Sequence, residues 1–407
     1  MNGRRVVVTG IGMLSALGVS RDTVWRRMLA GDCGIGDVTL FDAAGYRSTK
    51  AAEMPAYPRV ASVPEKAWGR LSRCDQTALL ASIEALDDAG IPAGALPDPS
   101  RAGVVFGTGT ADLLRNEEWF GEMRQVGIRR AAPSKIYDHF PSTPIDVVAG
   151  HFGFEGLKTS VLSACSSGTV AIGYAADAIA DGQLDVALAG ASDALARLTF
   201  SGFNALRLVD GEPCRPFCRT RKGMNVGEAA AVLVLEDYDR ARRRGARMYA
   251  EVAGYGARCE AYHPTSPEPE GRAVAALVQD ALRASRVSVD EVDHINAHGT
   301  ATPQNDQAEA RGFARVFGDR VRRLPVTSIK SMIGHCLSAA GAIEAAVLAL
   351  SLESGVIPPT IHYREADPEC ALDVVANSAR EAPIACGVST SLAFGGNDAA
   401  LVMRRIA

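Results

Sequence analysis

Two stretches of the chain repeat the same order of elements, and this repetition constrains the fold more than any other feature. In the first stretch, an apolar run ending at Leu162 leads to Cys165 and then to an Ala-rich helical pattern. In the second, the run Val326–Ile329 leads to His335 and the Ala/Gly-rich pattern Leu337–Glu353. A pair of apolar runs accompanies each: Val186–Gly190 with Ala230–Leu235, and Cys386–Ser391 with Ala400–Met403. The repetition predicts an internal duplication, two βαβαββ halves packed face to face with a site at their seam.

Apolar β-branched runs alternate with helical patterns along the whole chain, which is typical of a layered α/β fold. Further strands are expected at Arg5–Gly10, Ala102–Gly107, Ala250–Tyr255 and His294–Ala297. Further helices are expected at Asp75–Ala89, Ile145–His151, Ser166–Asp181, Glu270–Arg286 and Gln304–Phe317. A basic run at Arg240–Gly245 marks the crossover, so residues 1–250 are assigned to the first half and residues 251–407 to the second.

Cys165 is the candidate nucleophile. Its surroundings, Leu162-Ser-Ala-Cys-Ser-Ser-Gly-Thr169, predict a sharp turn that places the thiol on the first turn of a helix. Backbone N–H groups and the positive end of the helix dipole there favour a thiolate. The same N–H groups are suited to hold a developing oxyanion during acyl transfer. For a single cysteine, packing at a helix start is the commoner explanation, so other residues must decide.

Two histidines supply that decision. His298 and His335 each follow a short apolar run and are flanked by glycine, so both are expected at the C-terminal edge of a strand. Sites in α/β sheets are built at that edge. Two histidines at matching positions, with a cysteine at a third, are hard to explain as structural residues. The other histidines lack this setting and are interpreted as structural or surface residues: His139, His151, His263, His294 and His362.

The motifs around these residues resemble the Cys-His-His elongating β-ketoacyl-ACP synthases. The resemblance rests on three blocks in order: Ser163-Ala-Cys-Ser-Ser-Gly-Thr169, His298-Gly-Thr-Ala-Thr302 and Lys330-Ser-Met-Ile-Gly-His335. It extends from Val6–Gly12 to Phe394–Asp398. Within the family, Gly254–His263 and Pro303–Gln307 look most like the ketosynthase (alpha) subunits of type II polyketide synthases.

This resemblance implies a thiolase-like, five-layered αβαβα fold built from two duplicated halves. It implies that Cys165 carries the acyl chain, and that His298 and His335 hydrogen-bond the enolate oxygen through their Nε2 atoms. The N–H groups of Cys165 and Phe394 would hold the tetrahedral oxyanion. Lys330 and Glu309 could be an ordinary ion pair, but the resemblance favours a supporting role behind the histidines.

The implied reaction is the decarboxylative condensation of malonyl-ACP with an acyl chain on Cys165, which elongates a polyketide or fatty acyl chain. Neither a metal nor an organic cofactor is needed, because decarboxylation generates the nucleophile. The expected partners are acyl- and malonyl-loaded acyl carrier protein, and either a second copy of the chain or a chain-length-factor-like subunit. The segment Ser134–Pro141 would border the dimer interface and the partner's acyl pocket.

Composition excludes several other classes. The net charge of −4 argues against nucleic acid as a partner. Nine scattered cysteines indicate reduced thiols in a cytoplasmic protein, and Cys214 with Cys218 has no second pair for a metal site. Gly10-Ile-Gly12 lacks the third glycine of a dinucleotide fingerprint. Glu344 and Glu353 interrupt the most apolar late stretch, so no membrane span is expected.

Departures from the family pattern concern two places. Ala393 replaces the first glycine of the usual Gly-Phe-Gly-Gly loop, which predicts a restricted swing of Phe394. Cys218 and Lys222 replace two acidic residues, which puts local hydrogen bonding in question. Three alternatives stay open: a non-catalytic chain-length partner of the same fold, a fatty-acid-type homodimeric synthase, and a cysteine hydrolase that uses one histidine.

Overall fold

One large mixed sheet organises the molecule. The computed structural model describes residues 3–92, 94, 96, 98–109, 113–132 and 140–406. On one side the strands, in spatial order, are β5 (Lys158–Val161), β4 (Ala102–Gly107), β6 (Val186–Asp193), β8 (Ala229–Asp237) and β1 (Val6–Ser15). The sheet continues with β9 (Ala250–Cys259), β16 (Asn397–Arg404), β15 (Cys386–Ser391), β10 (His294–Asn296), β11 (Pro325–Thr327) and β13 (Asp373–Val374).

The strand order shows the duplication directly. From β1 outward, the sheet runs through the fifth, fourth, second and third strands of the first set, β1, β4, β5, β6 and β8. From β9 outward, the set β9, β10, β11, β15 and β16 follows the same order, with β13 added at the edge. The two sets join where β1 pairs with β9 through Val7 opposite Glu251 and Val8 opposite Ala250. Two independent folds would not be expected to share this order, so it agrees with the predicted duplication.

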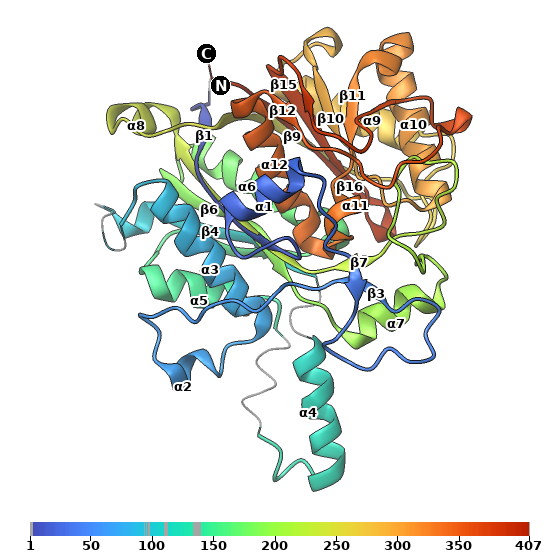
Figure 1. The fold of residues 1–407 in the computed structure, drawn as a ribbon. Coiled ribbons are helices and arrows are strands. Elements are labelled where there is room, and N and C mark those ends of the chain that lie inside the picture. Colours follow the sequence, from blue (N-terminus) through green and yellow to red (C-terminus); the bar gives the residue numbers. More distant parts are fainter. Residues whose placement is uncertain are drawn as a thin grey trace.

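Helices add three layers to the sheet, as Figure 1 shows. On one outer face, α3 (Arg73–Asp88) and α5 (Thr143–Phe152) cover the first set of strands. On the other, α9 (Arg272–Ser285) packs against β9 and β16, and α10 (Pro303–Phe317) packs against α9. Between the two parts of the sheet lie α6 (Ser167–Ala180) and α12 (Ala340–Ser354). The predicted five-layered αβαβα fold of two duplicated halves is confirmed.

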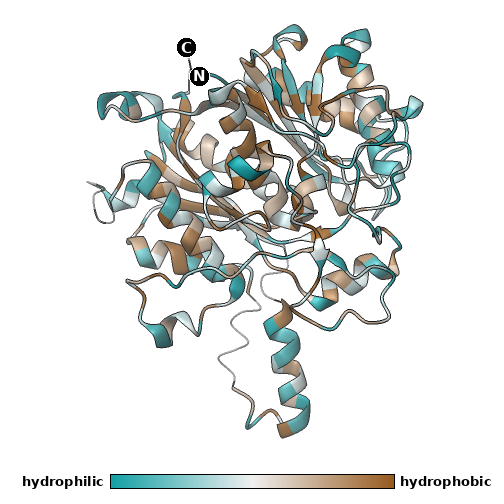
Figure 2. Ribbon diagram, in the orientation of Figure 1, coloured by the Kyte–Doolittle hydropathy of each residue, from teal (hydrophilic) through white to brown (hydrophobic). Residues whose placement is uncertain are grey.

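The central layer is largely hydrophobic, as the brown segments of its helices indicate (Figure 2). Every residue of α12 from Ala340 to Leu352 is buried, Glu344 included. The stretch Leu337–Ser354 is long and apolar enough to span a membrane, contrary to the expectation from its glutamates. However, 89% of it is buried inside the protein, as expected for a core helix.

Two glycines allow the central helices to approach each other. A Cβ on Gly168 of α6 would lie 2.8 Å from the backbone nitrogen of Ala342. A Cβ on Gly341 of α12 would lie 2.8 Å from the backbone nitrogen of Thr169. Real Cβ atoms do not come so close to a backbone atom, so each glycine is required by the other helix. This contact brings together the N-terminal ends of both helices.

Several elements differ from the sequence prediction. The bounds of β4 and β15 are those predicted, but the expected strand Val326–Ile329 ends at Thr327, and a one-turn helix, α11 (Lys330–Ile333), follows. Three longer helices were also not predicted: α1 (Arg21–Leu29), α4 (Leu113–Val126) and α7 (Arg197–Ala205). The remaining short elements are α2 (Glu65–Trp68), α8 (Tyr238–Arg243), β2 (Gly36–Asp37), β3 (Lys50–Ala52), β7 (Val226–Gly227), β12 (Val356–Ile357) and β14 (Arg380–Glu381).

Two sequence expectations stay predictions. The division of the chain into residues 1–250 and 251–407 is one of them. The other concerns the segment Ser134–Pro141, of which residues 134–139 lie outside the described residues. Phe140, at its end, is 52% exposed. The nearby helix α4 extends away from the body of the molecule (Figure 1).

Candidate active site

Cys165 lies in a tight turn between β5 and α6. The preceding residue, Ala164, has a φ of 52°, a left-handed conformation that is costly for a residue with a Cβ. Hydrogen bonds hold the turn: the Ser163 N–H donates to Ser167 Oγ at 2.9 Å, and that hydroxyl donates to the Ala164 carbonyl at 2.7 Å. The turn therefore stores strain to place the cysteine at the start of the helix, as the motif predicted.

Opposing effects act on the acidity of the Cys165 thiol. Burial raises the pKa of Cys165 to about 12, although the charge of Lys330 and a hydrogen bond from the Phe394 N–H both lower it. The N-terminal end of α6 also favours the thiolate, but the loss of solvation on burial opposes it. Burial therefore opposes the thiolate that the helix N-terminus favours, and the expectation of an activated Cys165 stays a prediction.

His298 is the second residue after β10 and is held there by Glu309 of α10. The backbone N–H groups of His298 and Gly299 donate to the two carboxylate oxygens of Glu309 at 2.8 and 2.7 Å. Thr390 and Asn305 also donate to this carboxylate, at 2.8 and 3.1 Å. Glu309 thus fixes the loop that carries the histidine rather than the imidazole ring itself.

His335 reaches the same site by another route. The prediction that His335 ends a strand was wrong. The helix α11 and Gly334, which has a φ of 66°, lie between β11 and the histidine. Its N–H donates to the Asn225 carbonyl at 2.7 Å, which ties it to the first half of the chain. The rings of His298 and His335 lie edge to face, with centroids 5.1 Å apart and an interplanar angle of 85°.

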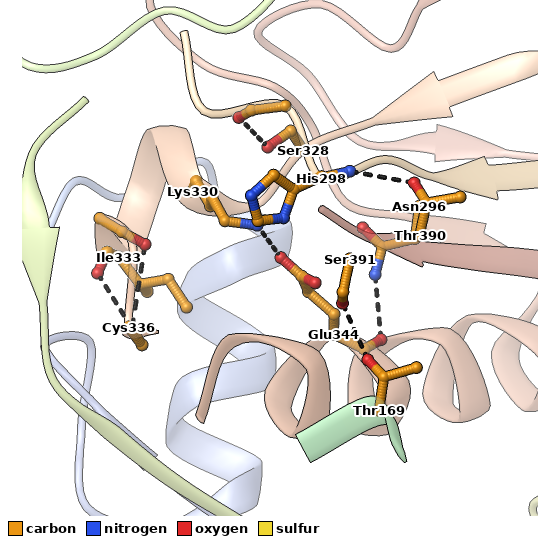
Figure 3. Close-up of polar contacts among 12 residues, drawn as sticks. Thr169, Asn296, His298, Ser328, Lys330, Ile333, Cys336, Glu344, Thr390 and Ser391 are labelled. Atoms are coloured by element: carbon orange, nitrogen blue, oxygen red, sulfur yellow. Dashed lines mark hydrogen bonds and ion pairs between the residues drawn. The ribbon is translucent and has the colours of Figure 1, made fainter. Parts of the chain in front are cut away.

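Lys330 determines the tautomer of His298. Figure 3 shows its side chain between the ring of His298 and the carboxylate of Glu344. Lys330 Nζ lies 3.3 Å from His298 Nδ1 and also donates to Glu344. An ammonium group has donors and no acceptor, so Nδ1 must accept and the ring proton must lie on Nε2. The predicted support of His298 by Lys330 agrees with this contact, but the ion-pair partner of Lys330 is Glu344 and not Glu309.

Both histidines are neutral at physiological pH. Burial, first of all, and then the nearby charge of Lys330 lower the pKa of His298 and of His335 well below 6.5. His335 also lowers the pKa of His298. Each ring therefore carries one N–H and one bare nitrogen, and acts as a hydrogen-bond donor without bringing a charge into the site.

These residues meet at one cavity of about 260 Å³. Cys165, His298, His335 and Phe394 all line it, whereas Lys330 and Glu309 do not. One wall is apolar and includes Phe203, Leu208 and Met224; another is polar and includes Thr300, Thr302 and Asn305. A cavity with an apolar wall and a few convergent polar groups is typical of a binding site for an extended small molecule.

Some residues of the site were missed or misplaced by sequence reasoning. Glu344 was noted only as an interruption of an apolar helix, although a buried acid in such a helix signals a buried partner. His263 was interpreted as structural or surface, but it borders the cavity. His294 is buried, with its ring bonded to the Pro325 carbonyl, as expected for a structural residue.

Comparisons with known proteins agree with this geometry. The family "Beta-ketoacyl synthase, N-terminal domain" matches residues 3–241, and "Beta-ketoacyl synthase, C-terminal domain" matches residues 249–364. The chain belongs to the β-ketoacyl synthase family. This ketosynthase is 40% identical over 415 residues to the tetracenomycin polyketide synthase ketoacyl synthase alpha subunit of Streptomyces glaucescens, covering 99% of the chain and 97% of that protein.

Two solved structures are similar over the whole ketosynthase. The ishigamide ketosynthase/chain length factor superposes with a TM-score of 0.94 at 35% identity, covering 100% of both chains. A type II polyketide synthase acyl-carrier protein in complex with its ketosynthase bound to the hexaketide matches with a TM-score of 0.92 at 30% identity, again covering 100% of both chains. The fold, the family and the closeness to type II ketosynthases therefore rest on sequence and structure together.

The two departures from the family pattern have different structural settings. Ala393 has an extended backbone, with φ −132° and ψ 152°, so alanine fits there without strain. The restricted swing of Phe394 stays a prediction. Cys218 is fully buried, and its sulfur lies 3.3 Å from Thr220 Oγ1 and accepts from the Arg364 N–H at 3.5 Å. The thiol thus takes part in the hydrogen bonding of this turn.

Proposed function

We propose that Cys165, His298 and His335 carry out a decarboxylative condensation that elongates an acyl chain in a type II system. The observation that supports this best is a single cavity onto which a buried thiol and two neutral histidines open. A cysteine hydrolase needs one base and one activated water, so it does not explain a second neutral histidine. A non-catalytic partner subunit does not explain a thiol that opens onto the same cavity as two histidines.

The first step transfers the acyl group. The sulfur of Cys165 attacks the thioester carbonyl carbon of an acyl carrier protein, a new carbon–sulfur bond forms, and the carrier thiol leaves with the proton that Cys165 loses. One thiol replaces another, so no net proton is exchanged. The Phe394 N–H already contacts the sulfur, which places it beside the carbonyl oxygen that becomes negative.

The second step makes the carbon nucleophile. Malonyl carrier protein loses carbon dioxide, and the electron pair of the broken carbon–carbon bond moves to the thioester oxygen. The Nε2–H of His298 is directed by Lys330 to donate to that oxygen, with His335 beside it. The enolate carbon then attacks the acyl-cysteine, and the released thiolate takes one proton from solvent. Neutral donors suit an enolate because they stabilise it without holding the malonyl carboxylate as an ion pair.

The partners follow from the same function. The ketosynthase acts on acyl- and malonyl-loaded carrier protein, and pairs with a second subunit, which is either a copy of itself or a chain-length-factor-like protein. Four exposed apolar side chains support such an interface: Phe120 of α4 is 53% exposed, Ile128 64%, Phe140 52% and Leu162 58%. An obligate dimer would bury such residues in an interface of roughly 2,000 Å² or more. Because the proposed reaction uses soluble carrier proteins, the ketosynthase is assigned to the cytoplasm.

Intact mass spectrometry with a panel of acyl carrier proteins tests this function. Acyl-loaded carrier protein should add one acyl group to the ketosynthase, and malonyl carrier protein should then release it as a β-ketoacyl product with carbon dioxide. Cys370→Ala is a suitable control, because this buried thiol does not line the cavity. Hydrolysis of the adduct without condensation would favour a hydrolase, and light scattering of an active monomer would contradict the dimer.

A further inference from the structure

Two carboxyl groups meet at the edge of the cavity, outside the residues already assigned to the reaction. Glu260 follows β9 and Asp398 is the second residue of β16, and both line the cavity. Their carboxyl groups lie within reach of a shared hydrogen bond. Asp398 is 3% exposed, so this contact is largely shielded from water. Two ionised carboxylates cannot form such a bond, because neither has a proton to donate.

The other hydrogen bonds of the pair leave one position for that proton. Asp398 Oδ1 accepts from the Ala393 N–H at 3.0 Å, and Glu260 Oε2 accepts from the Glu268 N–H at 3.0 Å. The remaining oxygens, Asp398 Oδ2 and Glu260 Oε1, are buried and receive no N–H or O–H donor from the described residues. A buried oxygen without a donor is costly, and one proton shared between these two oxygens satisfies both.

The pair joins the two loops that close the cavity. Asp398 holds Ala393, the residue before Phe394, while Glu260 lies in the loop that runs on to Pro267. Further backbone bonds connect the same loops: the Gly395 N–H donates to the Pro264 carbonyl at 2.8 Å, and the Glu260 N–H donates to the Gly396 carbonyl at 2.9 Å. The position of the Phe394 N–H against Cys165 therefore depends on this junction.

We propose that Glu260 and Asp398 share one proton and act as positioning residues that hold the Phe394 loop, and with it the Phe394 N–H, against Cys165. The assignment rests on the proposed function, because the position of the Phe394 N–H matters only if Cys165 accepts an acyl group. The pair touches no reacting atom: it acts only through the backbone of Ala393 and Phe394.

The charges around the pair support one retained proton. Burial, first of all, raises the pKa of Asp398 and of Glu260. A negative neighbour raises each pKa further: Glu309 acts on Asp398, and Glu268 acts on Glu260. Two arginines of the neighbouring segments are engaged elsewhere. Arg272 is bonded to Glu268, and Arg258, which lies opposite Asp398 in the β-ladder, is bonded to Asp280.

The sign of the pH dependence follows from these shifts. A carboxyl whose pKa is raised in the folded protein contributes fully at low pH, and its contribution is lost as pH rises through the raised value. Loss of the shared proton would leave two buried charges in contact and would separate the loops. The rate of Cys165 acylation should therefore fall on the alkaline side, by about tenfold per pH unit above the pKa of the pair. Ionisation of the thiol alone would change the rate in the opposite direction.

Asp398→Asn is the decisive variant, because its amide keeps an acceptor for Ala393 and supplies a permanent donor to Glu260. It should acylate at the wild-type rate near neutral pH and should lose the alkaline fall. Glu260→Gln should behave alike, and Asp398→Leu should acylate slowly at every pH. Asp290→Asn, the same change at an exposed carboxylate that does not line the cavity, is the matched control and should keep the wild-type profile. An alkaline fall that Asp398→Asn leaves unchanged, or its absence from the wild type, would overturn the proposal.

An infrared measurement on the resting protein separates this proposal from the function itself. The difference spectrum between wild type and Asp398→Asn should contain the band of a protonated carboxyl at neutral pH, which disappears as pH rises. No substrate is needed, so failure of acylation does not affect the result. A difference spectrum with carboxylate bands only, at neutral pH, would show that no proton is shared.

Discussion

The two halves of the molecule contain the same turn with different chemistry. In the first half the turn passes through Ala164, with a φ of 52°, to Cys165 and α6. In the second half it passes through Leu337, also with a φ of 52°, to Ser338 and α12. The cysteine lines the cavity, whereas the N–H and the hydroxyl of Ser338 both donate to Asp193 of β6, at 3.1 and 2.7 Å.

The two halves therefore share the backbone conformation of this turn but use it for different purposes. In the proposed function, the first half uses the turn to present the nucleophile. The second half uses the turn to bind the first half, and its proposed hydrogen-bond donors, His298 and His335, precede the turn. The structural counterpart of Cys165 is therefore Ser338, not His335 as the sequence pattern indicated. A site at the seam needs both kinds of turn.

The largest effect on activity is expected from substitutions in the two turns. Cys165→Ala should abolish acyl transfer to the protein, since no other residue lining the cavity in the described part of the chain is a thiol. Ser338→Ala should keep acylation and destabilise the fold by about 1 kcal/mol, because the Ser338 N–H still reaches Asp193. Intact mass spectrometry and denaturant unfolding check the two variants. An acyl adduct on Cys165→Ala would show that the nucleophile lies elsewhere.

The next effect concerns the donors of the second half. His298→Ala or His335→Ala should slow malonyl decarboxylation by about 10²–10³, the usual cost of one lost oxyanion donor. Acylation should fall much less, because no enolate forms in that step. Release of carbon dioxide and burst acylation can be measured separately. If both half-reactions fell equally, one histidine would be acting as the base of Cys165 and the division between the halves would be wrong.

The close contact between α6 and α12 should also make the stability of the fold sensitive to one added methyl group. Gly168→Ala or Gly341→Ala places a methyl group against the backbone of the facing helix and should cost roughly 1–3 kcal/mol of unfolding free energy, and more if the helices separate. Gly150→Ala in α5 is the matched control, because a Cβ there has no atom within 4 Å. Its helix should gain up to about 1 kcal/mol. Equal effects at all three positions would contradict a close seam.

The smallest expected effect concerns the protonation of the two histidines of the second half. Because both histidine pKa values lie well below 6.5, NMR should show neutral rings between about pH 6 and 8. Histidines with lowered pKa values stabilise the fold above the ordinary value, and this stability is lost as pH falls through their folded values. Lys330→Met should raise both pKa values, since it removes a nearby positive charge. Rings that titrate normally in the wild type would refute this.

Local patterns predicted much of the fold, because they depend on nearby residues. The bounds of β4 and β15, and the order strand, Cys165, helix, all follow from apolar periodicity and small residues. What the sequence did not predict depends on distant contacts. The four residues of α11 are too few to show a helical period, so His335 was placed at a strand end.

The protonation states of the site were less predictable than its residues. The pKa of Cys165 follows from burial that only the packed halves create. Likewise, the pairing of Lys330 with Glu344 and of Glu260 with Asp398 depends on which strands become neighbours. A glutamate inside an apolar helix was a visible signal for the first pair, but the sequence contained no comparable signal for the second.

The place of β16 in the sheet has a consequence for how the protein is made. This strand follows every other described strand in the chain, yet it lies at the centre of the sheet between β9 and β15, and its leading loop carries Phe394. A chain still on the ribosome therefore holds Cys165 and both histidines long before the cavity exists. Until β16 emerges, the newborn chain exposes two unpaired strand edges, and a copy that ends early can neither close its sheet nor acquire an acyl group.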